Sequence, residues 1–155
     1  MGKGEGDRLG STVAVSRDGG VVGVGAPGND DGGEDAGQVR VFEFSVRDGS
    51  WVQRGGDLNG VTMNDRLGDS PVGMSKHGDV IAIGSEWHQI KGMYGVGHVR
   101  VFEYNTTDWV QRGNDIDGTE EKQFFGETVD ISADGGVIVI GSPGSHVTDA
   151  YFGRV

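Results

Sequence analysis

One stretch of this chain occurs twice with little more than its middle changed. The first version, VRVFEFSVRDGSWVQRGGDLNG, runs from Val39 to Gly60, and the second, VRVFEYNTTDWVQRGNDIDG, runs from Val99 to Gly118. A catalytic motif usually occurs once per domain, whereas a segment that recurs along a chain indicates a copied structural unit. The repetition therefore constrains the fold more than any other feature of the sequence.

The repeat has a fixed period. The interval of 58 residues from Trp51 to Trp109 also separates Gly10 from Gly68 and Gly68 from Gly126. This period divides the chain into repeat one (1–61), repeat two (62–119) and repeat three (120–155). Repeat three stops at GRV, where the other two continue into RVFEF or RVFEY. We therefore expect repeat three to be an incomplete unit, and the chain to be part of a larger whole.

Each complete repeat predicts four short strands. The first (STVAVS, SPVGMS or ETVDIS) alternates apolar and polar residues, as a half-buried strand does. The second (VVGVGA, VIAIGS or VIVIGS) is apolar on both faces, which is typical of a strand buried between two layers. The third carries RVFE and the fourth is WVQRG, with hairpin turns between them. Since no segment shows sustained helical periodicity, the fold class is all-β.

A four-stranded antiparallel unit of this length fits a blade of a β-propeller. The chain would then supply about two and two-thirds blades of a larger or oligomeric propeller. A β-sandwich is the alternative, although sandwiches do not normally repeat at such a period with paired tryptophans. Glycine, at 31 of 155 residues, fits this interpretation, because bulky side chains would hold neighbouring sheets apart where they converge.

The recurring residues resemble the FG-GAP repeat of integrin α-chain propellers and related extracellular proteins. The resemblance covers almost the whole chain, and FGETVDISADGGVIVIGSPG in repeat three is its nearest match. Each repeat opens with a Leu-Gly or Phe-Gly pair and later carries a counterpart of Gly-Ala-Pro. The opening pairs are Leu9-Gly10, Leu67-Gly68 and Phe125-Gly126, and the later triplets are Gly25-Ala26-Pro27, Gly84-Ser85-Glu86 and Gly141-Ser142-Pro143.

The resemblance implies a non-enzymatic propeller segment at the cell surface or outside the cell, serving structural assembly, adhesion, or binding of a protein or glycan. The alternative is the propeller portion of a larger hydrolase, acting on glycans or lipids, with its catalytic groups outside this segment. The family's DxDxDG calcium loop has no counterpart here. The turns SRDGGV, SKHGDV and SADGGV are too short to wrap a cation that needs six to eight oxygens. Glu86 replaces the motif's proline, so we expect the turn at Glu86 to differ.

Charge and composition exclude several functions. The net charge of −11 argues against binding to nucleic-acid phosphates or to anionic membrane surfaces. The absence of cysteine excludes disulfides, thiolate zinc sites and cysteine nucleophiles. No stretch is apolar over the length that spans a bilayer, and no G-x-S-x-G elbow occurs. We assign no catalytic residue and no certain cofactor.

An acidic loop is the candidate metal site. It reads GNDDGGEDAG, and its hard oxygen ligands are of the kind that calcium prefers. The alternative is an acidic turn that simply faces solvent, because the matching loops of repeats two and three lack these carboxylates. The candidate calcium ligands are Asn29, Asp30, Asp31, Glu34 and Asp35.

The four histidines are expected on the surface rather than at a zinc site. His77 falls in a hairpin turn and His98 beside a strand, while His88 and His146 occupy equivalent loops of different repeats. No H-E-x-x-H spacing or similar pattern connects them.

Two further features suggest contacts at the surface. Trp87, Met93 and Tyr94 lie in the long loop of repeat two without counterparts in the other repeats, which makes this loop a candidate contact surface, with local packing as the alternative. Asn105 opens the sequon NTT on an expected turn, which favours glycosylation and an extracellular location.

The number of repeats predicts a missing partner. The smallest known propeller rings have about four blades, more than this chain supplies. We expect the rest of a longer chain, neighbouring subunits or an end-to-end stack of chains to complete the assembly, and to bury Tyr151, Phe152 and Val155.

Overall fold

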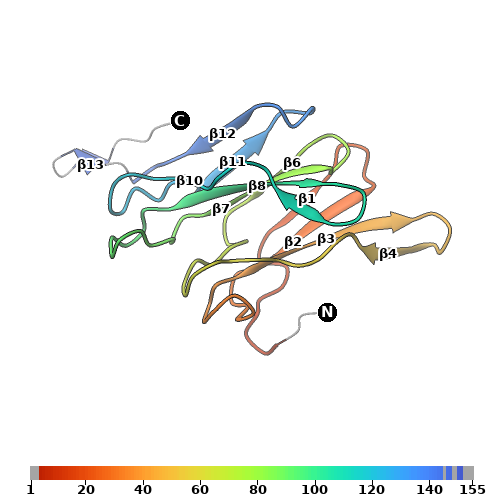
Figure 1. Ribbon diagram of the computed structural model, residues 1–155, viewed down its shortest axis with the longest axis horizontal. Helices are drawn as coiled ribbons and strands as arrows, with labels where there is room; N and C mark the ends of the chain where they lie inside the picture. Colours follow the sequence, from red (N-terminus) through yellow and green to blue (C-terminus); the bar gives the residue numbers. More distant parts are fainter. Residues whose placement is uncertain (1–3, 145, 148–149, 152–155) are drawn as a thin grey trace.

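The computed structural model describes residues 4–144, 146–147 and 150–151, and these residues form antiparallel β-sheets without any helix (Figure 1). Sheet 1 contains β1 (Val13–Val15), β2 (Val21–Ala26), β3 (Gln38–Ser45), β4 (Ser50–Gln53) and β5 (Leu58–Asn59). Sheet 2 contains β6 (Val72–Met74), β7 (Val80–Ser85), β8 (His98–Tyr104), β9 (Trp109–Gln111) and β10 (Ile116–Asp117). The all-β prediction is confirmed.

Strands follow chain order within each of the two large sheets. In sheet 1, β2 lies between β1 and β3, and β4 pairs with the far edge of β3. In sheet 2, β7 lies between β6 and β8 in the same way. VVGVGA and VIAIGS therefore form the second strand of each sheet, as predicted, and each has a strand on both sides. β7 is buried on each face, whereas Val22 and Val24 on one face of β2 are only half-buried.

The linker after the fourth strand forms more structure than its polar sequence predicts. β3 is longer than β4, so the fourth strand leaves the beginning of β3 unpaired. β5 fills this gap, with Asn59 opposite Gln38 and Leu58 opposite Val39. In sheet 2, β10 pairs with the start of β8 in the same way. The buried side chain of Leu58 explains why this part of the linker is held against the sheet.

Repeat three is shorter in the structure as well. Sheet 3 consists of β11 (Thr128–Ile131) and β12 (Ile138–Gly141), which pair with each other. A separate hairpin joins β13 (His146–Val147) to β14 (Ala150–Tyr151). Phe152 and Val155 lie outside the described residues, and the side chain of Tyr151 is not described, so their expected burial stays a prediction.

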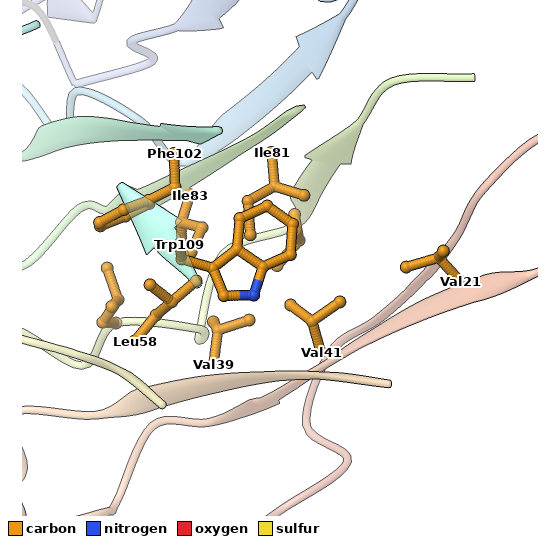
Figure 2. Packing of buried hydrophobic residues seen from close by; sticks show 10 residues of the cluster. Val21, Val39, Val41, Leu58, Ile81, Ile83, Phe102 and Trp109 are labelled. Carbon is orange, nitrogen blue, oxygen red and sulfur yellow. The ribbon is translucent and has the colours of Figure 1, made fainter. Parts of the chain in front are cut away.

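Successive sheets pack face to face. Between sheets 1 and 2 lies a cluster of ten buried residues, and Figure 2 shows Trp109 and Ile81 of sheet 2 facing Val39 and Val41 of sheet 1. Between sheets 2 and 3 lies a second cluster, in which Val80 and Ala82 face Val129 and Ile131. Sheet 2 therefore contributes both of its faces to the core. Figure 1 shows the sheets following one another between the chain ends.

The recurring glycines lie where one sheet meets the next repeat. A Cβ atom on Gly25 would overlap the carbonyl oxygen of Gly68, and a Cβ atom on Gly84 would overlap that of Gly126. Gly68 and Gly126 have φ angles of +87° and +90°, which side-chain-bearing residues rarely adopt. The prediction that glycines permit close approach of neighbouring sheets is confirmed at these two contacts.

The turn at Glu86 does not differ from its counterpart, contrary to expectation. The amide of His88 donates to the carbonyl of Ser85 at 3.1 Å, as that of Asn29 does to Ala26. The same turn hydrogen bond therefore forms with Glu86 in place of Pro27. The Glu86 carboxylate accepts a hydrogen bond from Ser70 Oγ at 2.5 Å, which holds it against the start of its own repeat.

Candidate functional site

The loop after the second strand returns to the first residue of the third strand in both complete repeats. In repeat one this places Asn29 beside Gln38, and both side chains are buried. The Gln38 side-chain amide donates to Asn29 Oδ1 at 3.3 Å, Asp31 Oδ2 at 3.0 Å and Asn59 Oδ1 at 2.8 Å. A neutral amide thus occupies the space among three oxygen atoms.

The candidate calcium ligands are brought together only in part. Asn29 Oδ1 also accepts from the Asp31 amide at 3.0 Å, and Asp30 Oδ1 accepts from the Asp35 amide at 2.8 Å. Asp30, Asp31 and Glu34 are exposed, whereas Asn29 is buried. Protein donors already hold several of the oxygens that a cation would use. Calcium binding by this loop stays a prediction of the sequence.

Calorimetry tests that prediction. If the loop binds calcium, the chain should release or take up heat at millimolar calcium, and its melting temperature should rise because only the folded state binds tightly. Alanine at both Asp31 and Asp35 should abolish the rise. Absence of calcium heat with the unchanged protein would leave an acidic turn that faces solvent.

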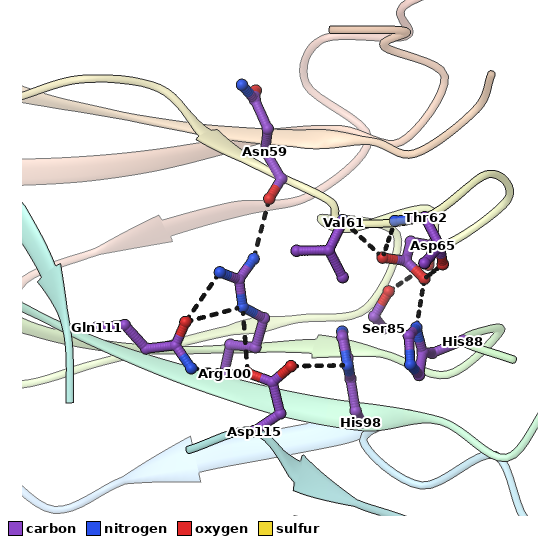
Figure 3. Close-up of polar contacts among 10 residues, drawn as sticks. All are labelled: Asn59, Val61, Thr62, Asp65, Ser85, His88, His98, Arg100, Gln111 and Asp115. Atoms are coloured by element: carbon purple, nitrogen blue, oxygen red, sulfur yellow. Dashed lines mark hydrogen bonds and ion pairs between the residues drawn. The ribbon is translucent and has the colours of Figure 1, made fainter. Parts of the chain in front are cut away.

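Repeat two places a different set of side chains at the equivalent position. His88 and His98 stand where repeat one has Asn29 and Gln38, and their rings stack with centroids 3.9 Å apart and planes 16° from parallel (Figure 3). Asp65, from the linker before β6, lies with its Oδ1 2.5 Å from His88 Nδ1. One oxygen of Asp65 and one ring nitrogen of each histidine lie within 4.8 Å of one another. We call Asp65, His88 and His98 the histidine cluster.

Asp65 is held firmly in the histidine cluster. Its Oδ2 accepts from the amides of Val61 at 2.8 Å and Thr62 at 3.0 Å, and its Oδ1 accepts from the Thr62 hydroxyl at 2.6 Å. Burial acts to raise the pKa of Asp65, but the hydrogen bonds from His88, Thr62 and Val61 outweigh it and lower the pKa to about 2. Asp65 is therefore an ionised carboxylate inside the protein.

His98 is fully buried, and neither of its ring nitrogens has a hydrogen-bond partner among the described residues. The closest acid on its other side, Asp115, has Oδ2 3.8 Å from His98 Nδ1, which is longer than a hydrogen bond. Burial, and after it the neighbouring His88, lower the pKa of His98 to about 4. His98 is thus a neutral imidazole with unsatisfied polar atoms, an arrangement that is costly in a protein interior.

The predicted contact residues of repeat two form an aromatic group around the same loop. The Trp87 ring lies 5.6 Å from Tyr94 and 5.4 Å from Phe124, and Arg66 lies over its face at 5.5 Å. Trp87 and Met93 are half-buried, whereas Tyr94 is exposed. Local packing therefore covers much of the Trp87 side chain, and of the three residues Tyr94 is the most accessible to a partner. Binding at this loop stays a prediction.

Asn105 lies on an exposed turn, as expected. Its Oδ1 accepts from the amides of Thr107 at 3.1 Å and Asp108 at 2.9 Å, a side-chain-supported turn. Glycosylation of Asn105 stays a prediction.

The expectation that the histidines lie on the surface is wrong for His98 and correct for His77, whose side chain is exposed. Sequence reasoning also missed Asp65, because no local motif connects it to histidines more than twenty residues away. One signal was present. The repeat alignment shows that the buried pair Asn29 and Gln38 is replaced by two histidines at once, although the surrounding strand sequence is kept.

No family model and no curated protein sequence matches this chain. Among the described residues, no helix has the length and apolar character that crossing a membrane requires.

Proposed function

We propose that this chain is a non-enzymatic segment of FG-GAP-type β-propeller repeats that serves assembly, adhesion or ligand binding outside the cell. Its sheets would pack at both ends against further repeats of the same kind. One observation carries this proposal: side chains that are buried between sheets in the interior of the stack are exposed at its two ends.

The outer face of sheet 1 is the first exposed end. Pairing of the strands places seven apolar side chains on this face: Val13, Val15, Val22, Val24, Phe42, Phe44 and Trp51. Val13 is 73% exposed, whereas its counterparts Val72 and Val129 are each 8% exposed. Trp51 is 47% exposed and its counterpart Trp109 is 8% exposed. These positions differ mainly in whether a preceding sheet covers them.

Sheet 3 exposes the opposite kind of face. Val137 and Val139 are 62% and 50% exposed, whereas their counterparts Val80 and Ala82 in sheet 2 are buried against sheet 3. The two ends are therefore complementary rather than alike. The outer face of sheet 1 corresponds to the face of sheet 2 that packs on sheet 1. The exposed face of sheet 3 corresponds to the face of sheet 2 that packs on sheet 3.

Complementary ends favour head-to-tail packing. An interface between two different faces continues into a ring or a filament, depending on the rotation between units. The close contacts of the glycines run in the same direction along the stack. A Cβ on Gly10 would meet nothing within 4 Å, whereas Gly68 and Gly126 each lie against the second strand of the preceding repeat. Exposed apolar sheet faces are usually covered in native proteins.

Light scattering of the isolated chain tests this proposal. We expect association that increases with protein concentration, because the outer face of sheet 1 of one molecule can cover sheet 3 of the next. Lysine at Val15, which is 61% exposed, should abolish association without unfolding the chain. Lysine at Val61 is the control, because Val61 is 48% exposed but lies in the linker between sheets 1 and 2, on neither end face.

A monomer at every concentration, with amides of sheet 3 well protected from hydrogen exchange, would overturn the proposal. That result would mean that the chain is self-sufficient and that its ends need no further repeats.

A further inference from the structure

The histidine cluster combines three features that an ordinary loop contact does not need. It has an ionised carboxylate that is inaccessible to solvent, two imidazoles in parallel contact, and a buried imidazole whose nitrogens have no hydrogen-bond partner among the described residues. Since buried polar atoms are nearly always paired, the unpaired nitrogens of His98 point to a ligand. The ligand must fit between side chains that already lie close together.

The chemistry of the cluster selects the ligand. Imidazole nitrogens and a carboxylate oxygen are the donor set of Zn²⁺ and of similar divalent transition metals. Calcium and magnesium instead prefer all-oxygen sites. Three such donor atoms lie within 4.8 Å of one another, so small side-chain shifts would bring them to a common ion. Asp65 also supplies a negative charge that offsets part of the charge of the cation.

Repeat one shows what this position looks like without metal ligands. There the Gln38 amide donates directly to Asn29, Asp31 and Asn59, and the position is filled by neutral hydrogen bonding. Repeat two has histidines in place of these amides. Its two rings contact each other face to face instead, and that contact satisfies no hydrogen bond of His98.

We infer that Asp65, His88 and His98 bind one divalent transition-metal ion of the zinc class. The ion takes the place of the hydrogen bond between His88 Nδ1 and Asp65 Oδ1, leaving the proton of the neutral His88 imidazole on its other ring nitrogen. It ties together three segments: the linker before β6, the loop after β7 and the start of β8.

A second grouping of potential ligands, His98 with Asp115 and Asp117, shares the same histidine. Both of its acids are exposed, and it contains one imidazole rather than two. It therefore lacks the buried donors that distinguish the histidine cluster, and the experiment below separates the two.

The experiment uses the full chain, freed of metal by a chelator and then titrated with Zn²⁺ in a calorimeter and with Co²⁺ in a spectrophotometer. We expect one ion per chain and a visible Co²⁺ absorption typical of nitrogen and oxygen ligands at a low coordination number. We also expect a higher melting temperature with Zn²⁺ but not with Mg²⁺. The melting temperature rises because the ion binds the folded chain alone.

The chain itself offers the test variant. The double variant His88→Asn and His98→Gln introduces the residues that repeat one has at the equivalent positions, where Asn29 and Gln38 pack together. We expect Zn²⁺ affinity to fall on the order of 100-fold or more, and the Co²⁺ absorption to disappear. If the double variant does not fold, His88→Asn alone, at a half-buried loop position, should still abolish the Co²⁺ absorption.

Two controls should keep the binding. His77→Asn removes a histidine in an exposed turn, and paired Asp115→Asn and Asp117→Asn removes the acids of the second grouping. The inference is overturned if Zn²⁺ does not bind at all, if the His88 variants bind it as the unchanged chain does, or if only the Asp115 and Asp117 variant loses it.

Discussion

Replacing Trp109 by alanine is expected to lower the free energy of unfolding by about 3–5 kcal/mol. The Trp109 ring lies in the cluster between sheets 1 and 2, close to Val39 and Val41 (Figure 2). Its Nε1 donates to the carbonyl of Arg54 at 2.7 Å, so truncation also leaves that carbonyl without this donor. The Arg54 guanidinium lies 5.9 Å from the Trp109 ring centre and would lose that contact as well. Urea denaturation of the monomer measures the loss.

Trp51→Ala is the matched control, since Trp51 occupies the same place in repeat one. Its ring packs edge-to-face on Phe44 at 5.5 Å, and the pair is exposed on the outer face of sheet 1. We expect a cost of about 1 kcal/mol or less in dilute monomer. Equal costs for the two variants would contradict the assignment of Trp109 to a contact between sheets. A cost for Trp51→Ala that grows with protein concentration would support packing on another molecule.

The second large effect is a loss of stability in acid that depends on His98. In metal-free solution, the unfolded chain protonates His98 near its ordinary pKa of 6.5, whereas the folded chain does so only near about 4. Between these values the unfolded state binds more protons, so stability decreases as the pH falls from 6.5 to 4. The contribution is fully present above pH 6.5, and its loss totals about 3 kcal/mol.

His98→Gln isolates this contribution, because Gln38 shows that glutamine fits the equivalent position. The groups around His98 are His88, Asp65, Asp115 and Arg100, and all four remain in the variant. The unchanged chain should therefore lose about 3 kcal/mol more than the variant between about pH 7 and about pH 4. Parallel stability curves for the two proteins would show that His98 is protonated equally in the folded and unfolded chains.

The strands of this protein could be predicted from its sequence because they depend on the alternation of side chains and on turn residues. Alternation of apolar residues, apolar second strands and Asp-Gly or His-Gly turns predicted the first, second and third strands in both complete repeats. Glycine at Gly25 and Gly84 predicted close approach between layers. The short strands β5 and β10 were missed. They form because the third strand extends beyond the fourth, a difference in length that depends on the register of pairing.

Repetition also let the sequence identify which positions are equivalent, but equivalence does not determine burial. Trp51 and Trp109 occupy equivalent positions in nearly identical sequences. Trp51 is nevertheless exposed and Trp109 buried, because only Trp109 has a preceding sheet to pack against. The apolar faces at the two ends follow from the same cause. They depend on the order of the sheets in space.

The all-β class, the repeat and the second strands could be predicted from the sequence alone, since they depend on side-chain alternation and turn chemistry within a few residues. The burial of His98, its stacking on His88 and the approach of Asp65 from a separate linker to within 4.8 Å of both depend on the fold. Register brings residue 98 to the loop that carries residue 88, and packing of the linker against sheet 2 brings residue 65. The cluster therefore depends on contacts between segments that are far apart in the sequence, and no local sequence pattern predicts it.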